Sequence, residues 1–63
     1  MSYGPRLRAY RKRLGVSQAE LAHALGWKTA AWVHRRERGP VELDRVTFAR
    51  ALAACEEIVR SEE

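Results

Sequence analysis

Apolar residues recur along this chain at spacings of three and four, which is the pattern of helices that each bury one side. Four segments show it, over residues 5–14, 18–25 and 29–38 and from about residue 44 onward. Their apolar positions are Leu7, Tyr10 and Leu14; Leu21, Ala22 and Leu25; Ala30, Ala31, Trp32 and Val33; and Val46, Phe48, Ala49, Leu52 and Ala53. No segment alternates with the period of two that is typical of a strand. The pattern therefore predicts an all-α protein.

Helix start and stop signals separate these segments. Residues 17–20 read Ser-Gln-Ala-Glu, a capping box in which Ser17 and Glu20 bond to each other's backbone N–H groups. Thr29 and Asp44 are predicted to cap the third and fourth helices. Glycine follows the first three helical segments at Gly15, at Gly26 and in the pair Gly39-Pro40.

The 63 residues are enough for one domain, over residues 1–63, with a flexible arm at 1–4 and a frayed tail at 61–63. A pocket that encloses a small molecule would occupy much of so small a core. We therefore expect that the protein is not an enzyme and binds neither a cofactor nor a small-molecule substrate. Cys55 is the single cysteine and cannot form an internal disulfide, which favours the reducing cytoplasm. His23 and Cys55 lack partners at metal-ligand spacing, so no metal site is expected. We expect no membrane association, because no apolar run approaches the length of a membrane span.

Basic residues are concentrated in the first two thirds of the chain. Residues 1–40 hold nine Arg and Lys against two Glu, a net charge of +7, whereas residues 41–63 have a net charge of −3. A chain divided in this way presents one face to a polyanion. A merely soluble basic surface would also explain the charge, but the arginines lie around the second and third helical segments. That distribution favours double-stranded DNA as the partner.

The second and third segments have the layout of a helix-turn-helix, which docks on DNA. The motif reads Arg11-x₃-Gly15-Val16-Ser17-Gln18-x-x-Leu21-Ala22-x-x-Leu25-Gly26, then Glu37-Arg38-Gly39, then Leu43-Asp44-Arg45-Val46-Thr47-Phe48-x₃-Leu52. It resembles the Cro/C1-type helix-turn-helix family, also called the XRE family, over residues 7–54. The resemblance implies a compact four- to five-helix, lambda-repressor-like domain.

Three residues acquire roles through this resemblance. Gln18 stands where the family has a glutamine that binds a backbone phosphate at a helix N-terminus. An exposed glutamine with no partner is the alternative. Arg11 and Glu37 stand where the family pairs an arginine of the first helix with a glutamate that closes the third. Such a pair would brace the third helix against the first, with a small net effect on stability.

One feature departs from the family pattern. Gly26 and Glu37 are eleven positions apart, whereas the family usually has ten. One residue is therefore extra, most simply in the turn at Trp27-Lys28.

The extra residue leaves two possible registers for the third helix. Alignment from its glutamate end makes Thr29 the cap and Val33 the buried residue. Alignment from the preceding glycine buries Trp32 and turns Val33 outward. We favour the first, because it keeps both the ion pair and the cap, although it leaves Arg36 where the family often has an apolar residue.

On the favoured register, the start of the third helix enters the major groove. The positions expected to face the bases are Ala30, Ala31, Trp32, His34 and Arg35. Arg35 suits guanine O6 and N7, or alternatively a phosphate, and His34 is either a donor or simply solvated. Tryptophans in the positions of Trp27 and Trp32 more often belong to a core or its rim than intercalate between bases. The expected phosphate contacts are Gln18, Lys28, Thr29, Arg38, Arg6, Arg8 and Arg13.

These observations lead to a functional hypothesis. The chain is expected to be a sequence-specific transcriptional regulator, Cro-like and a repressor, that acts in the cytoplasm on the nucleoid. It would insert the helix at about residues 29–38 into DNA as a homodimer, at least on DNA, with Leu52, Ile58 and Val59 as candidate contacts. The alternative is a protein-interaction module, such as an antitoxin or an adaptor to another regulator or polymerase, which would use the acidic tail from Glu56.

Overall fold

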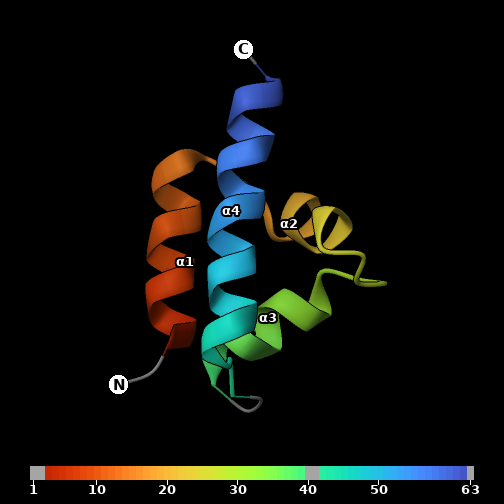
Figure 1. Cartoon of the computed structure of the whole chain (residues 1–63). Helices are drawn as coiled ribbons and strands as arrows, with labels where there is room; N and C mark the ends of the chain where they lie inside the picture. The colour runs from red at the N-terminus through yellow and green to blue at the C-terminus, as the bar shows by residue number, and fades with distance from the viewer. Residues whose placement is uncertain (1–2, 40–41, 63) are drawn as a thin grey trace.

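A computed structural model describes residues 3–39 and 42–62 of the chain (Figure 1). These residues form four helices: α1 (Tyr3–Leu14), α2 (Gln18–Ala24), α3 (Ala31–Arg38) and α4 (Arg45–Ser61). No strand occurs within them, so the all-α prediction is confirmed. None of these helices is long and apolar enough to cross a membrane.

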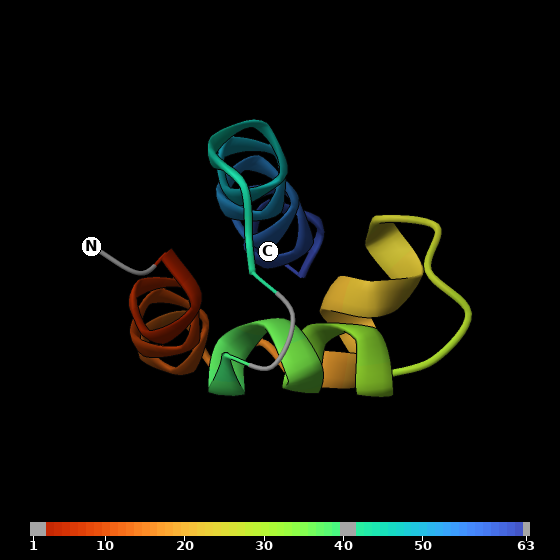
Figure 2. The same cartoon turned by 90° about the horizontal axis from the view of Figure 1, so that it is seen from below.

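The helices are arranged so that the two ends of α3 have different neighbours. α1 and α4 lie side by side and run in the same direction (Figure 1). α1 packs against α3 and α4, and α2 packs against the same two helices. In Figure 2, the C-terminal end of α3 lies beside α1, whereas its N-terminal end meets the turn that leads from α2.

All four helices contribute to one core. The largest fully buried side chains are Leu7, Leu21, Val33 and Cys55, one from each helix. The remaining buried apolar residues are Val16, Ala22, Leu43 and Ala51. Burial raises the pKa of the Cys55 thiol, so this residue serves as a small apolar side chain of α4.

Side-chain caps fix the starts of α2 and α4. The Ser17 N–H donates to Glu20 Oε1, and the Glu20 N–H donates to Ser17 Oγ, both at 3.0 Å. The capping box expected from the sequence is therefore present. Asp44 caps α4 as expected, because its Oδ2 accepts the Thr47 N–H at 3.2 Å. These hydrogen bonds stabilise the charged carboxylates and lower the pKa of both Glu20 and Asp44.

A glycine follows α2 at Gly26 and ends α3 at Gly39, as the sequence predicts. Gly26 has a φ of 76° and Gly39 a φ of 102°, both in the left-handed region that favours glycine. The N–H of Gly39 donates to the Arg35 carbonyl and closes the last turn of α3. Pro40, the other half of that stop signal, lies outside the described residues.

The flexible arm expected over residues 1–4 is wrong for Tyr3 and Gly4, which form the first turn of α1. The Tyr3 ring packs on Phe48 of α4 with 4.7 Å between ring centroids. Gly4 is buried against the backbone of α3, where its missing side chain permits close approach to Arg36. These long-range contacts order the segment, and residues 1–2 lie outside the described chain.

The frayed tail expected at residues 61–63 is also wrong for Ser61, which belongs to α4. Its hydroxyl donates to the Glu57 carbonyl at 2.7 Å, so the side chain supports the last turn. Residue 63 lies outside the described chain. In the C-terminal half of α4, Glu56 accepts a hydrogen bond from the Tyr10 hydroxyl of α1 at 2.9 Å, which raises the pKa of Tyr10.

Candidate nucleic-acid interface

The register of α3 follows from which of its residues are buried. Val33 and Glu37 are buried against the rest of the chain, whereas Trp32 leaves 44% of its surface exposed. This is the favoured register, in which Val33 rather than Trp32 faces the core. The outward side of the helix consists of Ala31, Trp32, His34, Arg35 and Arg38, all of them exposed. Ala30 is half-buried just before the helix.

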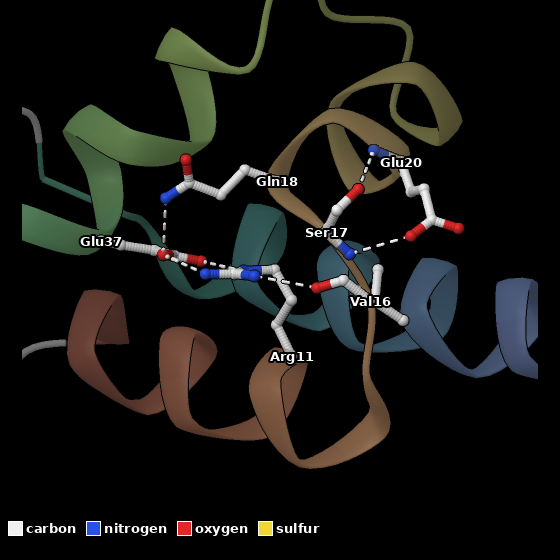
Figure 3. Close-up of polar contacts among 6 residues, drawn as sticks. All are labelled: Arg11, Val16, Ser17, Gln18, Glu20 and Glu37. Atoms are coloured by element: carbon white, nitrogen blue, oxygen red, sulfur yellow. Dashed lines mark hydrogen bonds and ion pairs between the residues drawn. The ribbon is translucent and has the colours of Figure 1, made fainter.

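A buried ion pair joins the C-terminal end of α3 to α1 (Figure 3). The Arg11 guanidinium donates from Nε to Glu37 Oε2 at 2.7 Å and from Nη2 to Oε1 at 3.0 Å. Its Nη1 donates to the Val16 carbonyl at 2.8 Å, in the loop before α2. The hydrogen bond to Glu37 raises the pKa of Arg11, which therefore stays charged. The pair implied by the family resemblance is present, and it links three segments.

Gln18 takes part in the same cluster, which the sequence did not reveal. Its Nε2 donates to Glu37 Oε1 at 3.2 Å across the gap between α2 and α3 (Figure 3). An amide nitrogen carries two hydrogens, so this bond orients the side chain and leaves a second donor direction. The buried carboxylate therefore positions Gln18 at the surface.

A basic groove lies beside this cluster, between α1, the start of α2 and the C-terminal half of α3. Its lining includes Arg8, Lys12, Gln18, His34 and Arg38. Three expected phosphate contacts, Arg8, Gln18 and Arg38, are thus brought together. Lys12 was missed, although it lies one helical turn from Arg8, a spacing that the sequence does show.

The other expected phosphate contacts lie elsewhere. Arg6 and Arg13 line a separate hollow with Ala9 and Tyr10, and the Arg6 guanidinium lies 5.7 Å from the centre of the Phe48 ring. Lys28 belongs to the turn before α3, at the opposite end of that helix from the groove. The structure therefore does not gather the seven residues into one site.

The expected Thr29 cap of α3 is wrong. α3 begins at Ala31 and its N-cap residue is Ala30, which makes no side-chain cap hydrogen bond. Ala30 already has helical backbone angles, with φ −59° and ψ −22°, so Thr29 precedes the cap position. The Thr29 carbonyl, not its hydroxyl, is bonded there and accepts the Trp32 N–H at 3.2 Å.

An aromatic clamp, formed by Trp27, Trp32 and Arg36, lies beside the N-terminal half of α3. The ring centroids of Trp27 and Trp32 lie 5.8 Å apart. The Arg36 guanidinium lies 4.9 Å from the centre of the Trp27 ring and 4.4 Å from that of the Trp32 ring. Arg36 Nη1 also donates to the Trp32 carbonyl at 3.3 Å. Such cation–π contacts explain why a charged residue fits where the family often has an apolar one. The spacing of four between Trp32 and Arg36 was the available signal in the sequence.

A hollow next to this clamp opens on the outward side of α3. It is lined by Thr29, Ala31, Trp32, Arg35 and Arg36. The base-facing candidates are therefore divided, with Trp32 and Arg35 beside the hollow and His34 in the basic groove.

Comparison with known families agrees with this architecture. The helix-turn-helix domain family model matches residues 2–56, and the chain belongs to that family. No curated protein and no solved structure matches the chain. The membership confirms the helix-turn-helix assignment and identifies the chain, at that coarse level, as a DNA-binding domain.

Proposed function

We propose that this protein is a sequence-specific transcriptional regulator, a Cro-like repressor that inserts α3 into the major groove of DNA. The observation that carries the proposal is the exposed side of α3, with Arg35 at its centre and a basic groove at one flank. The opposite side of the helix is fixed by buried Val33 and by the Arg11–Glu37 pair. A recognition helix needs this combination, since bases are read by outward side chains on a rigid support.

The proposed roles divide between bases and phosphates. Arg35 donates to guanine O6 and N7, and Ala31 permits close approach of the helix to the base edges. Arg8, Lys12 and Arg38 contact phosphates along the basic groove. Gln18 donates one amide hydrogen to Glu37 and its second to a phosphate, so the buried brace also sets a DNA contact.

We further propose that two copies act together on DNA, at half-sites about one helical turn apart. The candidate dimer residues Leu52, Ile58 and Val59 are partly buried and pack against the chain's own core. Only their remaining exposed surface is available to a second copy. Two copies are therefore expected to pair chiefly on DNA. The proposed place of action is the cytoplasm, where the nucleoid lies.

Selection of bound sequences from a random DNA pool, followed by titration at several salt concentrations, tests this proposal. We expect a defined half-site and a log–log salt slope of about −0.9 for each phosphate neutralised. Arg35→Ala should flatten the preference at one base position, a loss of about 1–3 kcal/mol in discrimination. Arg38→Ala should instead weaken all sequences alike and reduce the slope by about one.

Arg50→Ala is the matched control, because it removes the same charge from an exposed position on α4. It should leave the selected sequence unchanged. The absence of any DNA binding at low salt would overturn the proposal, and the reverse behaviour of the two α3 variants would show that the helix is docked differently.

A further inference from the structure

The outward side of α3 has two chemically different flanks. Successive residues of an α-helix are about 100° apart, so Arg35 lies opposite the buried Val33–Glu37 side. Arg38 lies on one side of Arg35, toward the basic groove, and Trp32 lies on the other, toward the turn. The first flank is suited to phosphates, whereas the second presents an aromatic surface.

Trp32 is exposed yet held in place. It keeps 44% of its surface exposed, in a position where a free indole would sample several rotamers. The Arg36 guanidinium lies 4.4 Å from the centre of its ring, and the Trp27 ring lies 5.8 Å away. The clamp therefore presents the Trp32 ring in one orientation beside Arg35.

The hollow that these residues line combines an apolar wall with a guanidinium donor. The Trp32 ring and the Ala31 methyl group supply the wall, and Arg35 lies next to them. In the major groove, guanine offers two acceptors, O6 and N7, and the apolar group is the C5-methyl of thymine. A thymine beside a guanine therefore presents an apolar group next to an acceptor pair, which matches the hollow.

We propose that Trp32, held by Arg36, is a specificity-determining residue that packs on the C5-methyl group of a pyrimidine next to a guanine bound by Arg35. This inference rests on the proposed function and names the base step that α3 reads. Arg36 is a positioning residue, because it acts through the ring of Trp32.

The test uses two random duplex pools, one made with thymine and one with uracil in its place. Uracil lacks only the C5-methyl group. The wild-type protein should select a thymine–guanine step from the first pool and lose the preference at the thymine position in the second. A selected duplex should bind about fourfold more weakly when that one thymine becomes uracil, the factor that follows from burying one methyl group.

Variants assign the effect to its residues. Trp32→Ala should bind the thymine and uracil versions of the selected duplex equally, while retaining the preference for guanine. Arg36→Met should reduce the ratio of the affinities for the thymine and uracil duplexes and shift the tryptophan fluorescence. Arg36→Lys keeps the positive charge and should retain part of the wild-type ratio and of the wild-type fluorescence. Arg38→Ala is the control, since it should lower affinity for both duplexes and keep their ratio.

The outcomes separate this inference from the proposed function. A defined half-site that is identical in the two pools would overturn the role of Trp32 and leave the regulator proposal standing. A thymine-to-uracil ratio that survives Trp32→Ala would also overturn it. Selection of no half-site from either pool would mean that the regulator proposal itself fails.

Discussion

The two ends of α3 are held in different ways. At the C-terminal end, Glu37 is buried and paired with Arg11 at 2.7 Å, and Gly4 of α1 packs on the helix backbone. Toward the N-terminal end, the half-buried Arg36 side chain lies against the rings of Trp27 and Trp32, and no side chain caps the helix. The first end is tied to distant parts of the chain, whereas the second is held by residues within ten positions of one another.

The two ends of α3 are therefore expected to have different roles. The tied end fixes α3 against α1 and the loop before α2, so changing it would disturb three segments at once. The clamped end lies beside the outward residues that would meet the bases. A change at the clamped end is therefore expected to alter these outward residues with less effect on the core.

The largest expected effect is at the tied end. Glu37→Ala leaves the Arg11 guanidinium buried without its carboxylate, which typically costs about 3–5 kcal/mol. A domain of this size has little more stability than that, so the variant is expected to be largely unfolded at 25 °C. Thermal melting followed by circular dichroism measures the change.

Glu57→Ala is the control for this variant, because Glu57 belongs to an ion pair whose side chains are 70% and 71% exposed. It should alter the free energy of unfolding by less than about 1 kcal/mol. Equal melting temperatures for the two variants would contradict the proposed importance of the buried pair.

Gly4→Ala should give the next largest effect. A Cβ atom at this position would meet the Arg36 carbonyl oxygen, so α1 and α3 would have to move apart. Overpacking of this kind costs about 1–3 kcal/mol, measured as a lower midpoint in urea. Helix propensity alone predicts the opposite effect of this substitution, an increase of about 1 kcal/mol in the free energy of unfolding. A more stable variant would therefore show that the close approach is unimportant.

Arg36→Ala should have a smaller effect, confined to the clamped end. Loss of the cation–π contacts and of packing by the side chain should lower stability by about 0.5–2 kcal/mol. The tryptophan emission should shift while the helical circular dichroism at low temperature stays the same. An unchanged emission spectrum would mean that the guanidinium does not order the rings.

Loss of the Glu20 and Asp44 charges in acid should produce the smallest change and should spare the clamp. The lowered pKa values of Glu20 and Asp44 mean that their caps stabilise the fold above the ordinary carboxyl pKa and lose that contribution as the pH falls through the lowered values. Urea midpoints should therefore decline below about pH 4. Asp44→Asn keeps a capping side chain but cannot titrate there, so its decline should be shallower; a parallel decline would exclude Asp44 as a contributor.

The sequence predicted the tied end of α3 better than the clamped end. The four helical segments could be predicted from the spacing of apolar residues, and the capping box from its short-range chemistry. The Arg11–Glu37 pair could be predicted from the family resemblance. The register was chosen because it kept that pair and a Thr29 cap; the pair is present and Val33 is buried, whereas the Thr29 cap is not formed.

The errors arose where tertiary contacts override local signals. Thr29 has a good capping side chain, but Ala30 already has helical backbone angles, so the hydroxyl lies outside the cap position. The order of Tyr3 depends on Phe48, 45 positions away, which no local pattern contains. The link between Gln18 and Glu37 likewise requires knowing how α2 and α3 cross.

The Arg11 guanidinium has a consequence for how the protein responds to heat. Its three nitrogens serve α3 and the loop before α2 from a position on α1, and Gln18 bonds to the same carboxylate. Melting of any one of these segments would break hydrogen bonds that the others depend on. The proposed DNA-binding surface should therefore disappear in the same cooperative transition as the core, so that warming gives a sharp loss of occupancy on DNA instead of a gradual weakening.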